Sequence, residues 1–170
     1  FLLLGTFMVL IMSVTSALPA HMVSLLRESG MNEAWVITVP ASIGVLQVVG
    51  RLLLYCFEAR LDVHQANRWI PCLIVLGLVV LLLGGHDPLW ALVFVACYGM
   101  GNGMITIAKG TLPLALFGSA GYGQRQGYLA VGSRLMQASA PYVFGLVLEA
   151  HGGAAALMLS TALSILALGA

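Results

Sequence analysis

The chain has 170 residues, of which 61% are hydrophobic and 8% charged, and its formal net charge is +1. A soluble domain carries roughly 25% charged residues, and a core of this length could not cover so much apolar surface. The composition therefore excludes an ordinary soluble domain and predicts a protein that lies in a lipid bilayer. The sequence has no run of basic residues, so nothing in it indicates a nucleic-acid partner.

Six apolar stretches fill almost the whole chain, and most charged residues lie between them. A helix needs about 20 apolar residues to cross a bilayer. We therefore predict an all-α, polytopic membrane protein with six transmembrane helices, at about residues 1–26, 34–57, 69–84, 89–108, 126–148 and 154–170. Residues 109–123 hold too short an apolar run to cross, and we expect an interfacial segment or a helix extension there.

Lysine and arginine residues are unevenly shared between the two sides of the membrane. The loops after the second and fourth spans, with the span ends beside them, hold Arg51, Arg60, Arg68, Lys109 and Arg125. The loops after the first, third and fifth spans hold only Arg27. Because cytoplasmic loops are the richer in Lys and Arg, we predict a multi-pass protein of the cytoplasmic (inner) membrane whose first span runs outward.

Polar side chains are also unevenly shared among the spans. The third and sixth spans carry no charge, whereas the first, second, fourth and fifth carry most of the polar side chains. Polar groups in a bilayer face the bundle interior or water, so we expect these four spans to line a cavity. The pattern repeats after three spans, which predicts two three-helix repeats, residues 1–85 and 86–170. Three is an odd number, so the second repeat is inverted in the membrane.

Arg134 is the most informative single residue. It lies about nine residues into the fifth span, roughly 13 Å of helix rise, and Gln137 follows on the same helix face. A guanidinium at this depth predicts binding of an anionic group of a substrate. The alternative is an arginine whose head reaches back to the inner membrane interface.

His21 is the one clearly intramembrane group that titrates near neutral pH, so it is the candidate for proton coupling. The alternative is a hydrogen-bonded histidine beside the Pro19 kink. Asn102, Gln47 and Lys109 complete the candidate cavity residues, although Lys109, like Arg51, could simply anchor its helix at the cytoplasmic interface.

Gly99 and Gly103 form a GxxxG pattern, which predicts close packing against a neighbouring helix. The cysteines form no CxxC pair, and His64, His86 and His151 stand singly in loops. We therefore expect no metal site, no cofactor and no catalytic residues.

The chain resembles the carboxy-terminal half of a bacterial major facilitator superfamily transporter along its whole length. The motifs that carry the resemblance are Ala20-His21-Met22-Val23, Gly44-x-x-Gln47-x-x-Gly50-Arg51, Gly101-Asn102-Gly103, Lys109-Gly110-Thr111-Leu112-Pro113-Leu114 and Ala140-Pro141. Both ends of the chain lie inside apolar runs, which also indicates a piece of a longer protein.

The resemblance implies that a missing amino-terminal six-helix half forms the other wall of a central cavity, and that the two halves rock in alternating access. The family's charged loop, roughly G-x-x-x-D-R-x-G-R, should follow the second span. Here only Glu58-Ala59-Arg60 resembles it, and the glycines are missing. By this resemblance Glu58 and Arg60, with Arg51, would act in gating.

The sequence therefore predicts half of a secondary active transporter that moves a small solute, such as an organic anion, across the cytoplasmic membrane. Efflux of a drug or metabolite is nearly as good an interpretation, because Met100, Met104 and Met136 indicate an adaptable apolar lining. An intramembrane enzyme would need His21 within hydrogen-bond reach of a serine such as Ser133 or Ser139. A channel would need a symmetric oligomer with a constricting ring.

Overall fold

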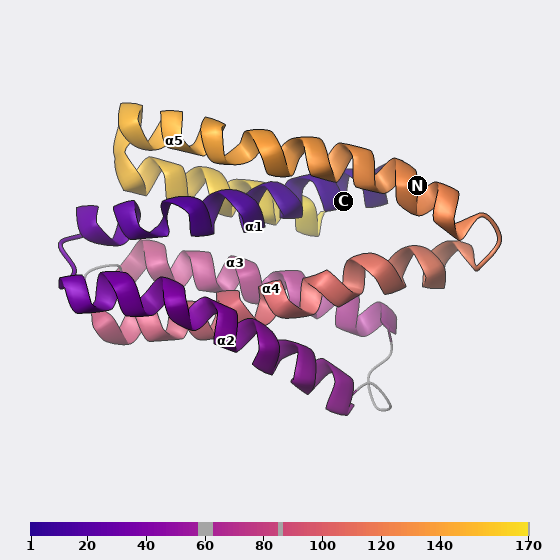
Figure 1. Ribbon diagram of the computed structural model, residues 1–170, viewed down its shortest axis with the longest axis horizontal. Coiled ribbons are helices and arrows are strands. Elements are labelled where there is room, and N and C mark those ends of the chain that lie inside the picture. The colour runs from indigo at the N-terminus through magenta and orange to yellow at the C-terminus, as the bar shows by residue number, and fades with distance from the viewer. Residues whose placement is uncertain (58–62, 85–86, 170) are drawn as a thin grey trace.

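The computed structural model describes residues 1–57, 63–84 and 87–169, and for residues 63–68 the backbone alone. This part of the chain is all-helical. It contains α1 (Leu2–Glu28), α2 (Glu33–Phe57), α3 (Val63–Gly84), α4 (Pro88–Phe117) and α5 (Tyr122–Leu168) (Figure 1). The predicted gating residues Glu58 and Arg60 lie outside the described residues.

Among the described helices, α1, α2, α4 and α5 are long and apolar enough to cross a membrane, while the apolar part of α3, Trp69–Gly84, is shorter. These helices confirm the prediction of an all-helical, membrane-embedded protein. The number of crossings and their direction stay predictions.

Helix α5 is interrupted at Gly152. At 1.5 Å per residue, an unbroken helix of its 47 residues would be about 70 Å long, more than twice the thickness of a bilayer core. Gly152 has φ 79° and ψ 174°, a conformation open to a residue without a Cβ. In Figure 1 the chain reverses there, and the two arms of α5 run back along each other. The predicted spans at 126–148 and 154–170 fall on these two arms.

Two helices extend beyond the predicted apolar spans. Helix α3 begins at Val63, before the expected start at residue 69, and α4 continues past residue 108 to Phe117. Hydropathy marks only the apolar part of a helix. The helix itself can continue into polar surroundings, because its backbone hydrogen bonds do not depend on apolar side chains. Of the two alternatives for residues 109–123, the structure has the helix extension, followed by a turn at residues 118–121.

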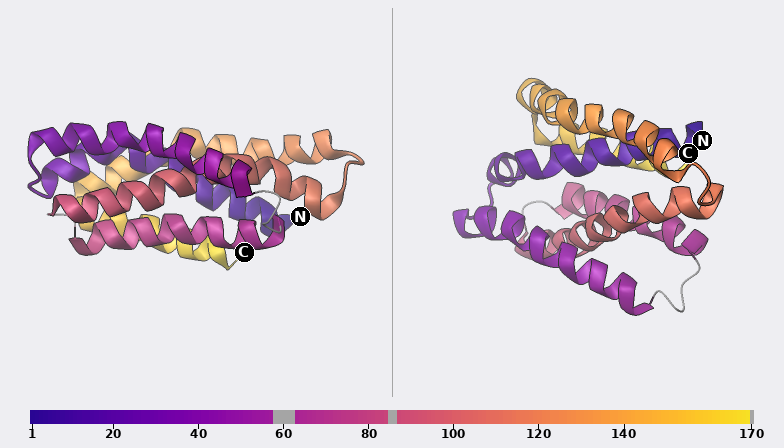
Figure 2. Two further views of the ribbon diagram at one scale, coloured as in Figure 1. Left: turned by 90° about the horizontal axis from the view of Figure 1, so that it is seen from below. Right: turned by 45° about the vertical axis from the view of Figure 1, so that its right-hand side comes forward.

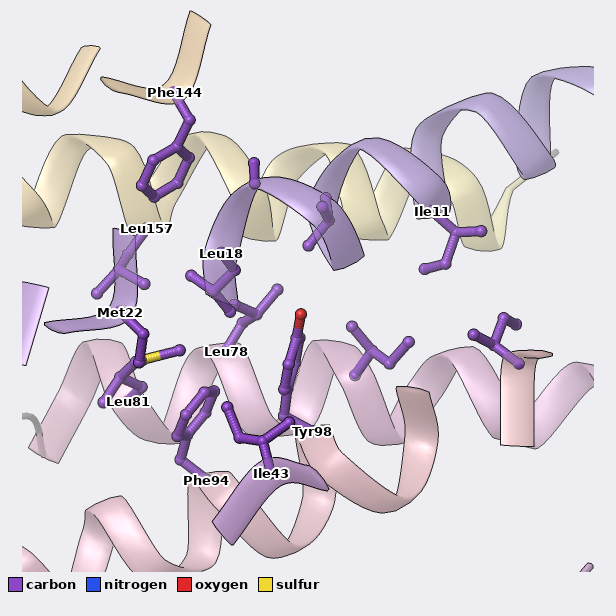
Figure 3. Close-up of a cluster of buried hydrophobic side chains, with 14 of the residues drawn as sticks. Ile11, Leu18, Met22, Ile43, Leu78, Leu81, Phe94, Tyr98, Phe144 and Leu157 are labelled. Atoms are coloured by element: carbon purple, nitrogen blue, oxygen red, sulfur yellow. The ribbon is translucent and has the colours of Figure 1, made fainter. Parts of the chain in front are cut away.

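The helices form two groups. Helix α1 packs along α5, and α4 packs against both α2 and α3, as Figure 2 shows from a second side. A cluster of buried side chains joins the two groups (Figure 3). In it, Leu18 and Met22 of α1 lie over Leu78 of α3 and over Phe94 and Tyr98 of α4.

Glycines allow α4 to approach its neighbours closely. A Cβ on Gly103 would collide with the backbone carbonyl of Gln47, and a Cβ on Gly99 would lie 2.8 Å from the Leu46 side chain. Both glycines of the GxxxG pattern therefore face α2. Gly101 faces α3 instead, where a Cβ would come within 2.9 Å of Ile74.

Candidate functional site

A small cavity of about 90 Å³ lies where α1, α4 and α5 meet. Its lining combines cations, amides and apolar side chains: Met8, Met12, Lys109, Gln126, Leu129, Ala130, Ser133, Arg134 and Gln137. Three of the predicted cavity residues, Lys109, Arg134 and Gln137, come together here from α4 and α5.

Positive charge dominates this cavity. Lys109 is half-buried and lines the cavity together with Arg134, and both Arg134 and Arg51 of α2 lie near enough to repel its charge. Arg27–Glu33 is the one ion pair within the described residues, and neither partner belongs to the cavity. Lys109, Arg134 and Arg51 therefore have no carboxylate partner in this part of the chain. Like charges brought together in a poorly solvated place favour binding of an anion between them.

The side-chain amide of Gln137 holds Arg134 at its position through two contacts, one to Arg134 and one to α1. Its Nη1 donates to Gln137 Oε1 at 3.3 Å, and Gln137 Nε2 in turn donates to the Met12 sulfur at 3.1 Å. Gln137 thus links Arg134 to α1. A guanidinium has five N–H donors, and this bond uses only one of them. The others stay available to a bound anion.

Gln126 is a cavity residue that the sequence analysis missed. Its Nε2 donates to the backbone carbonyl of Lys109 at 3.3 Å. That carbonyl lacks a partner within α4, because Pro113, four residues later, has no N–H. Helical periodicity counted back from Arg134 would have found Gln126, since residues 126, 130, 133, 134 and 137 share one face.

The other predicted cavity residues lie elsewhere. His21 contacts α5, where its Nε2 lies 2.8 Å from the Pro141 carbonyl oxygen and its ring stacks on Phe144 with 5.4 Å between centroids. Because a carbonyl only accepts, Nε2 carries a hydrogen. Gln47 presents its backbone to Gly103 in the α2–α4 contact.

The pair that an intramembrane enzyme would need is not formed at His21. Ser133 and Ser139 donate to carbonyls of their own helix, those of Leu129 and Leu135, at 2.7 and 3.0 Å. His21 is instead engaged with the Pro141 backbone.

Asn102 is buried on α4, with 8% of its surface exposed. The other buried polar residues, Ser13, Ser160, Thr161 and Ser164, all donate to carbonyls four residues earlier. The Asn102 amide has no such partner among the described residues. Lys109 follows it by seven residues, about 10.5 Å of helix rise along the same face.

The methionines that line the cavity are Met8 and Met12, not those singled out in the sequence. Met104 lies in a separate apolar pocket with residues of α2 and α3. The backbone of Met100 packs against Gly50. A thioether lining is therefore present, but α1 supplies it.

A scan of protein-family models finds none that matches this chain, and a search among curated proteins finds no significant match. The likeness to major facilitator transporters thus stays a resemblance in the motifs quoted above. What the protein does must be inferred from its own residues.

Proposed function

We propose that this chain is the carboxy-terminal six-helix half of a secondary active transporter of the major facilitator type. It would move a small organic anion across the cytoplasmic membrane by alternating access. The observation that carries the proposal is that Lys109 and Arg134 line one cavity, without a carboxylate partner among the described residues.

Charge at bilayer depth is costly, so an ionisable group there is retained for function by default. Two cations that share one cavity, Lys109 and Arg134, make the cost higher. An anion that enters between them removes this repulsion and satisfies free guanidinium donors. The site therefore discriminates strongly in favour of anions over neutral or cationic solutes.

The arrangement of helices supports the proposed repeats. Helices α1, α2 and α3 would form the first repeat, residues 1–85, and α4 with the two arms of α5 would form the second, residues 86–170. The break at Gly152 divides α5 into the two rods that the second repeat needs. In this arrangement the exposed Arg134 lies on the wall that the missing amino-terminal half would face.

Efflux of an apolar metabolite or drug is the second candidate. The observation in its favour is that Met8 and Met12 line the same cavity as the cations. Flexible, polarisable thioethers adapt to ligands of different shape. The two candidates differ in the charge that they require of the solute.

Counterflow with the full-length protein in liposomes tests the proposal. Vesicles are loaded with an unlabelled anion, and entry of the same labelled anion from outside is followed for a panel of small mono- and dicarboxylates. A secondary transporter gives transient, saturable accumulation of chemically unchanged label. A channel gives no accumulation above equilibrium, and an enzyme converts the compound. Exchange confined to apolar cations would contradict the anion proposal.

A further inference from the structure

Two side-chain amides near the cationic cavity have hydrogen-bonding atoms without a partner among the described residues. One is Gln126, whose Oε1 is the single fully buried side-chain nitrogen or oxygen without a partner in the described part of the chain. The other is Asn102, buried on the face of α4 that also carries Lys109. Buried polar groups in native proteins are nearly always paired, so the unpaired Oε1 of Gln126 in this cavity calls for a functional reason.

The orientation of the Gln126 amide follows from its neighbour. The atom 3.3 Å from the Lys109 carbonyl must be the donor Nε2, because exchanging it for Oε1 would bring two acceptors together. Oε1 is therefore the unpaired atom. The Lys109 ammonium lines the same cavity but makes no bond to it in this structure.

Asn102 lies on the inward face of α4, between Tyr98 and Lys109. Tyr98 precedes it by four residues and reaches α1, since its hydroxyl bonds to the Thr15 carbonyl. Residues at this spacing share one helix face, so Asn102 also points toward α1, whose Met12 lines the cavity. Its amide adds one neutral donor group and one neutral acceptor to this side of the bundle.

From these two amides we infer that the substrate is a polar anion, which carries neutral hydrogen-bonding groups such as hydroxyls beside its charge. The inference rests on the proposed anion transport and names the substrate class. Lys109 and Arg134 bind the charge, and Asn102 and Gln126 bind the neutral groups. A site that hydrogen-bonds a hydroxyl rejects the analogue without it far more strongly than an apolar pocket rejects a missing methylene.

Glycerate and propionate are the matched probes, because they share a three-carbon carboxylate and differ in two hydroxyls. The full-length protein is purified in detergent, and the concentration of each anion that gives half-maximal thermal stabilisation is measured. We expect glycerate to act at a concentration at least about 10-fold lower than propionate.

The variants Asn102→Leu and Gln126→Met remove the amides at similar size. We expect the double variant to bring the ratio of the two concentrations close to one. We also expect Asn102→Leu to melt at the same or a higher temperature without ligand, because it replaces an amide that has no hydrogen bond among the described residues with an apolar side chain. Gln124→Met is the control, since Gln124 is exposed on the same helix and bonds only to Tyr128.

The outcomes separate the two proposals. If both anions stabilise the wild type equally and Arg134→Ala abolishes both effects, the anion site stands and the inference on polar substrates is overturned. If neither anion stabilises the protein at any concentration, the proposed anion site fails and takes the inference with it. A glycerate preference that survives in the double variant overturns the role of the two amides.

Discussion

The buried hydroxyl of Tyr98 on α4 donates a hydrogen bond of 3.5 Å to the backbone carbonyl of Thr15 on α1. Figure 3 shows this hydroxyl pointing toward α1. The Thr15 carbonyl has no helical partner, because the residue four positions later is Pro19. The same relation recurs at Pro113, where Gln126 bonds the carbonyl of Lys109. Two prolines thus each free a carbonyl that another helix then binds.

The Tyr98 contact can be measured with a double-mutant cycle. We expect Tyr98→Phe, which keeps the ring, to lower the free energy of unfolding by about 1 kcal/mol, since it leaves a buried carbonyl unpaired. In a Pro19→Ala background an N–H returns to the helix, and the same substitution should cost less. Equal costs in both backgrounds, measured by denaturation in detergent, would show that the hydroxyl and the freed carbonyl are not coupled.

Gly103 tests the close packing of α4 on α2. We expect Gly103→Ala to destabilise the protein by about 1–3 kcal/mol, because its Cβ would collide with the Gln47 backbone, which cannot move as a side chain would. Gly44→Ala is the matched control on α2, where a Cβ would meet no atom within 4 Å. Thermal unfolding of both variants provides the comparison. Equal melting temperatures would disprove the contact.

Glu28 caps the second arm of α5 from α1. Its Oε1 accepts a hydrogen bond of 2.9 Å from the backbone N–H of Gly153, directly after the break. Removal of a helix cap costs about 0.5–2 kcal/mol, and we expect a loss of this size for Glu28→Ala in the free energy of unfolding. Glu28→Gln keeps an acceptor oxygen and should lose less. Glu149→Ala, at an exposed glutamate of the same region, should leave stability unchanged.

The Arg27–Glu33 pair joins the end of α1 to the start of α2, with 2.8 Å between Nε and Oε1. The hydrogen bond from Arg27 lowers the pKa of Glu33 below its ordinary value of 4.5. A lowered pKa in the folded state stabilises the protein above the ordinary value, and this contribution is lost as the pH falls through the lowered one. Both side chains are well exposed, so the effect is small. We expect the melting difference between wild type and Glu33→Gln to shrink as the pH falls below 4.5 and to vanish below the lowered pKa, and a constant difference would contradict the pairing.

The sequence predicted those features that depend on local composition. Arg134, Gln137 and Lys109 stood out because polar groups are rare in apolar runs, and the structure places all three at one cavity. Gln126 escaped notice because it stands at the edge of its span, where polar residues are ordinary.

Contacts between distant segments could not be predicted in this way. The partner of His21 is a backbone oxygen, that of Pro141, and no pattern of residue types marks a backbone atom 120 positions away. The sequence left open whether α4 continues past residue 108, because Lys109 and Pro113 resemble the end of a helix. Pro113 leaves the Lys109 carbonyl without its helical hydrogen bond, and Gln126 of another helix donates the bond instead.

The central claim is that Arg134 binds the anionic group of the substrate. Anion uptake into liposomes that contain the Arg134→Ala variant tests this claim most directly. Counterflow of an anion that the wild-type full-length protein exchanges is measured for Arg134→Ala, with Arg27→Ala as a control that removes a positive charge from the end of α1. We predict that kcat/KM falls at least about 30-fold for Arg134→Ala and stays unchanged for Arg27→Ala, while both proteins remain folded. Unchanged counterflow by a folded Arg134→Ala protein would contradict the account.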